Sequence, residues 1–93
     1  MRVTIKSFGP VRRALGSNVV DVEVSLGATV ADVIRRAVSD RGASAASIIL
    51  NGNDISGNLI ILLNRRDTDH LQGLLTPVHD GDEITILPHV QGG

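Results

Sequence analysis

The chain has 93 residues, a formal net charge of −1 and no cysteine. The small net charge favours neither nucleic acid nor an anionic membrane, and the absence of cysteine excludes disulfides, thiolate metal sites and cysteine nucleophiles. Phe8 is the single aromatic residue, so a platform that stacks bases on aromatic rings is excluded as well. Without an apolar run long enough to span a bilayer and without a signal-peptide pattern, the sequence predicts a cytoplasmic protein that forms one domain over residues 1–93 and binds neither membrane nor nucleic acid.

The first quarter of the chain predicts two strands. Residues 2–8 and residues 20–24 alternate apolar and polar side chains with a period of two, as half-buried strands do. Gly9-Pro10 breaks the first strand, and residues 11–16 are expected to form a short turn or loop. Because the connection is short, the two strands are expected to pair as an antiparallel hairpin.

A helix is predicted next. Thr29 is a good N-cap, and Asp32 three positions later completes an approximate capping box. Apolar residues then recur at i, i+3, i+4, i+7 and i+8 from Val30 to Val38, which is one stripe of an amphipathic helix. Gly42 is expected to end it.

The second half of the chain predicts two further strands. Residues 59–64 form the third strand and residues 83–87 the last, with a partly apolar connection over residues 71–78. Residues 43–57 are expected to be a loop that contains a small hairpin at Asn51-Gly52.

The order strand, strand, helix, strand, strand predicts an α+β fold. One helix can cover only one face of a sheet. We therefore expect a mixed sheet of four to five strands packed on one main helix, as in a β-grasp fold. In this arrangement the first and last strands are parallel neighbours.

The other face of the sheet also carries apolar residues. Residues 59–63 are apolar at every position, so Ile60 and Leu62 point outward if their neighbours face the helix. Phe8 and Leu87 fall on the same outer face by alternation. Phe8, Ile60, Leu62 and Leu87 are named the outer patch here, and an exposed apolar patch indicates a partner site. The alternative is that residues 43–57 fold back over this face.

The end of the chain carries the clearest motif. The last thirteen residues, GDEITILPHVQGG, combine an acidic turn, an apolar strand, a proline and a final Gly92-Gly93. Residues 8–17, FGPVRRALGS, and the strand end Leu62-Leu63-Asn64 accompany it. With these motifs the chain resembles the ubiquitin-like sulfur carriers, which include the small subunit of molybdopterin synthase (MoaD), the thiamine-pathway carrier (ThiS), the ubiquitin-related modifier and small archaeal modifiers. The resemblance covers about residues 1–41 and 59–93.

The resemblance implies a carrier that is itself a substrate, with Gly93 as the reactive residue. Its terminal carboxylate would be adenylated by a ubiquitin-activating-type adenylyltransferase and converted to a thiocarboxylate. ATP and a sulfur donor would be used by that partner, and the carrier itself would bind no cofactor or metal. A sulfur-accepting enzyme, such as the large subunit of molybdopterin synthase in molybdenum cofactor biosynthesis, would be the second partner.

The tail, about residues 88–93, is expected to be flexible and to thread into a narrow channel. Extended, it reaches about 20 Å. Gly92 lets the backbone approach closely because it has no Cβ, and Val90 and Gln91 are the expected tail contacts. A functionless frayed end is the alternative for this segment.

The remaining polar residues favour ordinary surface roles. His70, His79 and His89 lack a compact metal-ligand spacing, and Asp80, Asp82 and Glu83 are explained by turn chemistry. Lys6 is the only lysine, so self-conjugation through a lysine side chain could use no other residue. Besides the sulfur carrier, two readings remain open: a ubiquitin-like protein modifier and a non-conjugated binding module that acts through its sheet.

Overall fold

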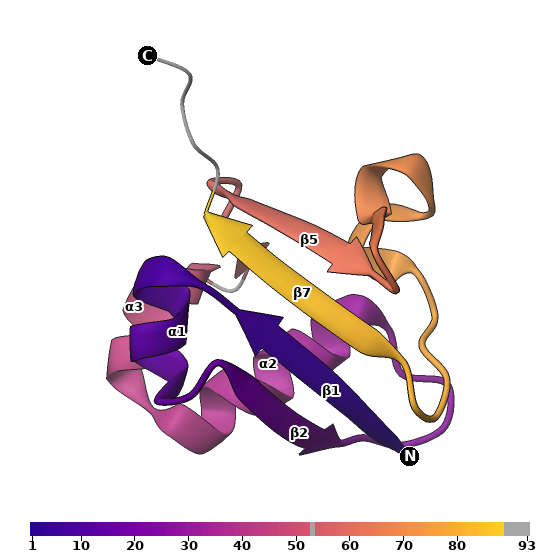
Figure 1. The fold of residues 1–93 in the computed structure, drawn as a ribbon, viewed down its shortest axis with the longest axis horizontal. Coiled ribbons are helices and arrows are strands. Elements are labelled where there is room, and N and C mark those ends of the chain that lie inside the picture. The colour runs from indigo at the N-terminus through magenta and orange to yellow at the C-terminus, as the bar shows by residue number, and fades with distance from the viewer. Residues whose placement is uncertain (53, 89–93) are drawn as a thin grey trace.

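The computed structural model describes residues 1–52 and 54–88, which form one mixed sheet with helices on one of its faces (Figure 1). The sheet has the strand order β2-β1-β7-β5-β6, with β1 at Arg2–Ser7, β2 at Val19–Glu23, β5 at Leu59–Leu63, β6 at Arg66–Asp67 and β7 at Glu83–Pro88. The helices are α1 at Gly9–Leu15, α2 at Val30–Arg41 and α3 at Ala43–Ile49, with 3-10 turns η1 at Thr68–His70 and η2 at Gly73–Leu75. A separate small hairpin joins β3 at Leu50–Asn51 to β4 at Asp54–Ile55.

The strand pairing confirms the predicted β-grasp. β1 pairs with β2 in antiparallel fashion and with β7 in parallel fashion. β5 pairs antiparallel to β7 on the other side. The first and last strands of the chain are therefore central neighbours, and β7 carries the chain out of the middle of the sheet.

Helix α2 begins and ends where the sequence predicts. The Thr29 hydroxyl accepts a hydrogen bond from the amide of Asp32, and the Asp32 carboxylate accepts one from the amide of Thr29 at 2.9 Å. This reciprocal capping box satisfies two amides that the first turn would otherwise leave unpaired. The apolar stripe from Val30 to Val38 is buried. Gly42 ends the helix with a φ of +90°, a conformation that costs glycine little.

Helix α1 corrects the expectation of a turn or loop over residues 11–16. Pro10 lies in the first turn, where its fixed φ suits a helix and its missing N–H is not needed. Val11 and Leu15, one helical turn apart, are both buried in the core. Gly16 ends the helix in the left-handed conformation. Val11, Ala14 and Leu15 are spaced i, i+3 and i+4, but three positions over seven residues were too short a pattern to reveal the helix in the sequence.

The segment 43–57 is also more ordered than a loop. The hairpin at Asn51-Gly52 is confirmed, but α3 precedes it and was missed. Ala45 and Ile49 are 0% exposed and belong to the same core cluster as the residues of α2. α3 packs against α1 and α2 on the helical face of the sheet. The alternative interpretation, that this segment folds back over the outer face, is therefore wrong.

The core on the helical face is aliphatic. Its largest fully buried side chains include Ile5, Ile34, Ile49, Ile84 and Ile86. Among residues 1–52 and 54–88, no helix has both the length and the apolar character needed to cross a bilayer.

Candidate functional site

Three strands bring the residues of the outer patch together. β5 and β7 pair Ile60 with Leu87, and the parallel pairing of β1 with β7 ends at Ser7 opposite Ile86. Phe8 continues the extended backbone of β1, with φ −140° and ψ 156°. The register thus places Phe8, Leu87 and Ile60 in one row across the sheet, on the face that points away from the helices.

The next row along the sheet is mixed. Lys6 and Leu62 both lie in register with Thr85, one on each side of β7. Leu62 therefore extends the apolar row by one residue, and Lys6 borders it with a positive charge. The two rows together place all four residues of the outer patch on the same face.

The outer patch is open to solvent. Phe8 is 50% exposed, and Ile60, Leu62 and Leu87 are partly exposed, whereas their sequence neighbours Ile61 and Ile86 are buried. The described helices all lie on the other face of the sheet (Figure 1). Apolar side chains gathered on an uncovered sheet face are typical of a surface that docks a partner.

Charged pairs occupy the outer face beyond the patch. Lys6 Nζ lies 3.2 Å from a carboxylate oxygen of Glu83, and Arg2 Nε donates to Glu23 at 3.0 Å. This hydrogen bond, with the attraction of the same carboxylate, raises the pKa of Arg2 above its ordinary value. Since an arginine is charged in any case, this shift leaves the protonation state of Arg2 unchanged at neutral pH.

The acidic turn before β7 has a structural role. Asp82 accepts hydrogen bonds from the amide of His79 at 2.8 Å and from the side-chain amide of Asn64 at 3.1 Å. The side-chain oxygen of Asn64 accepts from the amide of Glu83 at 2.9 Å. These bonds tie the turn after β5 to the start of β7. Within the described residues, no group of three histidines or carboxylates is arranged to hold a metal ion.

Sequence reasoning missed this use of Asn64. Asn64, which was expected to end the third strand, instead forms a tight turn with Arg65, and both residues have positive φ. Arg66 and Asp67 pair with β5 as the short strand β6. The available signals were Asn64 at one turn and, further along the chain, the turn Asp80-Gly81-Asp82 before β7. Asparagine and aspartate side chains at turns often bond to nearby backbone amides.

The described end of β7 lies beside a groove. Pro88 is the last residue of β7 and pairs with Leu59. A groove of about 790 Å³ opens next to it, and its apolar lining includes Pro10, Ile48 and Leu50. Leu59 and Pro88, the chain neighbours of Ile60 and Leu87, line this groove, which was not foreseen from the sequence. The expected reactive residue Gly93 and its neighbours Gly92, Gln91 and Val90 lie outside the described residues.

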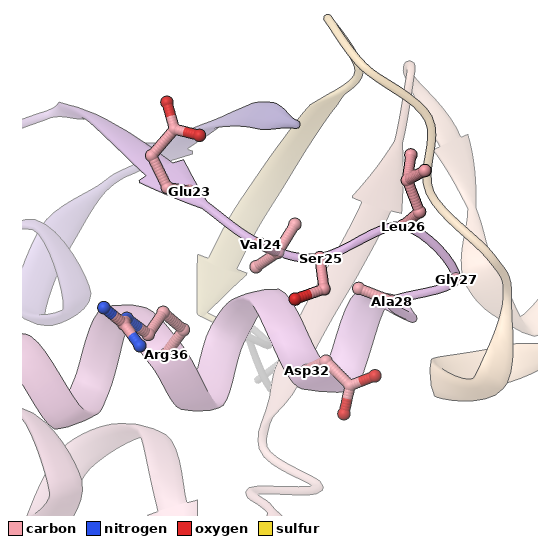
Figure 2. Close-up of a pocket in the computed structure, with 8 residues that line it drawn as sticks. All are labelled: Glu23, Val24, Ser25, Leu26, Gly27, Ala28, Asp32 and Arg36. Atoms are coloured by element: carbon pink, nitrogen blue, oxygen red, sulfur yellow. The ribbon is translucent and has the colours of Figure 1, made fainter.

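A second hollow lies at the other end of the molecule, between the end of β2 and α2 (Figure 2). It measures about 540 Å³ and is lined by Glu23, Val24, Ser25, Leu26, Gly27, Ala28, Asp32 and Arg36. Its charged side chains already have partners: Glu23 binds Arg2, Asp32 caps α2, and Arg36 lies 3.7 Å from Asp40. Leu26 points away from α2 in Figure 2 and is 88% exposed. The charged groups of the hollow are thus used within the fold, and the hollow is a weaker candidate for a functional site than the face beside Pro88.

Comparisons with known proteins agree with this geometry. The profile of the ThiS family matches residues 5–93. The small archaeal modifier protein 3 of Haloferax volcanii is 30% identical over 93 residues, which is the full length of both chains. The solution structure of the small archaeal modifier protein 1 of Methanosarcina acetivorans superposes with a TM-score of 0.82 at 32% identity, covering 99% of this chain and 96% of that one. A chain in the crystal structure of the Amycolatopsis orientalis BexX/CysO complex matches with a TM-score of 0.75 at 29% identity, covering 98% and 99%.

Proposed function

The chain belongs to the ThiS family of ubiquitin-like sulfur carriers and modifiers, and from that premise we propose that it carries sulfur as a thiocarboxylate on Gly93. Members of this family are small carrier or modifier proteins that work with activating enzymes and sulfur-accepting partners, and are not themselves catalysts. The role proposed for it is that of a molybdopterin synthase small subunit. In this proposal the chain is a substrate and a cargo carrier in the cytoplasm.

The observation that carries the proposal is the course of β7. One strand holds Leu87 in the outer patch and then reaches Pro88, from which only five residues remain to Gly93. Five extended residues reach roughly 17 Å. An enzyme that reacts with the Gly93 carboxylate therefore has to lie close to the outer patch and to the groove beside Pro88, so that docking and chemistry use neighbouring surfaces.

The proposed chemistry has two steps. A terminal carboxylate is ionised at neutral pH, since its ordinary pKa is about 3.3–3.7. In an activating enzyme its oxygen attacks the α-phosphate of ATP, which gives an acyl-adenylate and releases pyrophosphate. A sulfide-level nucleophile from the donor then attacks the acyl carbon, and AMP leaves with the former carboxylate oxygen, so that one oxygen is replaced by sulfur with no change of oxidation state. The carrier supplies the carboxylate and the docking surface, and the partner supplies the catalytic groups.

Intact-protein mass spectrometry tests this proposal. The chain is incubated with a cognate ubiquitin-activating-type adenylyltransferase, ATP and a sulfur donor. The expected result is the mass change of one oxygen-to-sulfur exchange, which is absent when ATP is omitted. A chain that keeps its mass with an enzyme known to load another carrier would contradict the proposal. The same spectrum verifies that Gly93 is the last residue of the protein used.

A second candidate function is that of a protein modifier. A relative that matches along the whole chain is named a small archaeal modifier protein. The same activated Gly93 would then be transferred to an amine of a target protein, and an ATP-dependent amide conjugate would distinguish this function from sulfur loading alone. A non-conjugated binding module would give neither product.

A further inference from the structure

Lys6 is the single side-chain amine of this protein. Of its nine basic residues, eight are arginine and one is lysine. A guanidinium stays protonated and is a poor nucleophile, whereas a lysine amine can lose its proton and attack an acyl group. Acylation of side-chain amines, by any donor, is therefore confined to one position of the chain.

This position borders the outer patch. Lys6 lies on the outer face of β1, two residues before Phe8 and in register with Thr85, which is two residues before Leu87. Same-face neighbours along a strand are about 7 Å apart. A group attached to Lys6 is therefore a same-face neighbour of Phe8 along β1 and a diagonal neighbour of Leu87 on β7, each about 7–8 Å away.

The amine is accessible and defined in position. The Lys6 side chain is 44% exposed, and its Nζ lies 3.2 Å from a carboxylate oxygen of Glu83 on β7. This diagonal ion pair holds the amine above the central strands and away from the helical face. Within the described residues, Lys6 thus forms its ion pair on the outer face itself, with a residue of β7.

We propose that Lys6 is the site at which a second copy of this chain is attached through its activated Gly93, and that the attachment closes the outer patch. The inference rests on the proposed activation of Gly93. The deprotonated Nζ attacks the carbonyl carbon of the acyl-adenylate, forming an amide bond. The bond from that carbon to the adenylate oxygen breaks, AMP leaves, and the amine proton passes to solvent. No oxidant or reductant is needed.

The attachment turns a carrier into a form that cannot be activated. The acceptor copy loses the positive charge that neutralises Glu83, and the attached copy covers Phe8 and Leu87. The acceptor still has a free Gly93 carboxylate, but its docking face is closed. The donor copy has an open face, but its carboxylate is used in the amide. Neither copy of the linked pair can then be loaded with sulfur, so the linkage removes carriers from the loading cycle.

The first experiment detects the linkage. Wild-type chain and the matched variant Lys6→Arg, which keeps the positive charge beside Glu83, are each incubated with the activating enzyme and ATP, without a sulfur donor. Wild type should give an amide-linked pair whose peptide map joins Gly93 to Lys6, and Lys6→Arg should not. A parallel reaction with the sulfur donor measures thiocarboxylate. Thiocarboxylate without any Lys6-linked pair overturns this inference and leaves the proposed function standing. Loss of both products overturns both.

The second experiment tests the closure of the face. A bulky amine-reactive fluorescein ester modifies Lys6 and the terminal amine of wild type, but only the terminal amine of Lys6→Arg. Sulfur loading is then compared before and after labelling for each protein, so that any difference between the unlabelled proteins cancels. Labelling should reduce loading of wild type roughly tenfold or more, the scale of losing a docking anchor, and should leave that of Lys6→Arg unchanged. Equal ratios for the two proteins would overturn the closure.

Discussion

Ile60 on β5 lies directly opposite Leu87 on β7, and both side chains remain partly exposed on the face of the sheet that no described helix covers. A cross-strand apolar pair of this kind contributes about 0.2–1 kcal/mol to stability. That is small beside the burial of a core isoleucine. The pair is therefore better suited to docking than to holding the fold, and substitutions there separate the two roles.

Leu87→Glu should weaken binding to the activating enzyme by more than about 1 kcal/mol, roughly fivefold or more, because a charge would then lie in the centre of the docking surface. The free energy of unfolding should change by less than about 1 kcal/mol. Calorimetric titration and urea unfolding measure the two quantities. Leu26→Glu is the matched control, since Leu26 is 88% exposed at the other end of the molecule. If Leu87→Glu unfolded the domain, the assignment of Leu87 to the outer face would be wrong.

Deletion of Gly93, or addition of one residue after it, should abolish sulfur loading and leave the fold intact. The core of the described residues lies in the strands and helices. A change of one residue moves the carboxylate by about 3.3–3.6 Å along an extended chain, far enough to take it out of attack geometry. Mass spectrometry reports loading, and circular dichroism reports the fold. Equal loading of the shortened and full-length chains would show that Gly93 is not the acceptor of sulfur.

Ile49→Ala should lower the free energy of unfolding by about 2–5 kcal/mol, the usual cost of removing a buried isoleucine side chain. Ile49 is 0% exposed and ties α3 to the common core. The neighbouring Ile48 is 38% exposed, so Ile48→Ala should cost much less. Urea unfolding of both variants makes the comparison. Equal small effects would mean that α3 is not part of the core.

Arg65→Gly should raise the free energy of unfolding by about 0.5–1 kcal/mol, the cost of left-handed backbone for arginine less the entropy cost of glycine. Asn64 and Arg65 form a two-residue hairpin turn with φ values of +50° and +71°. Positive φ is unfavourable for arginine and costs glycine little, and Asn-Gly is the preferred pair for such a turn. Arg66→Gly, within strand β6, should be destabilising instead. Thermal unfolding of the two variants tests the opposite signs, and a stability loss in Arg65→Gly would contradict the turn geometry.

Patterns within single elements were enough to predict most of the architecture. Strict alternation predicted β1 and β2, and Thr29, Asp32 and Gly42 predicted both ends of α2, because capping and periodicity depend only on residues a few positions apart. The all-apolar run at residues 59–63 indicated that one set of its side chains faces outward. The Gly-Gly ending with its proline and acidic turn led to the family that the comparisons show.

The tertiary structure alone decided which segments, far apart in the sequence, pack against each other. Helices α1 and α3 have too few turns for a clear period, and they are stabilised by burying Val11, Leu15 and Ile49 against distant parts of the chain. The sequence left open whether residues 43–57 cover the outer face, and packing places them on the helical face. The bonds of Asn64 to Asp82 and Glu83 and the ion pair of Lys6 with Glu83 join residues 18 to 77 positions apart. Such contacts follow from strand register, and register is fixed only when the two faces of the sheet are sorted into core and surface.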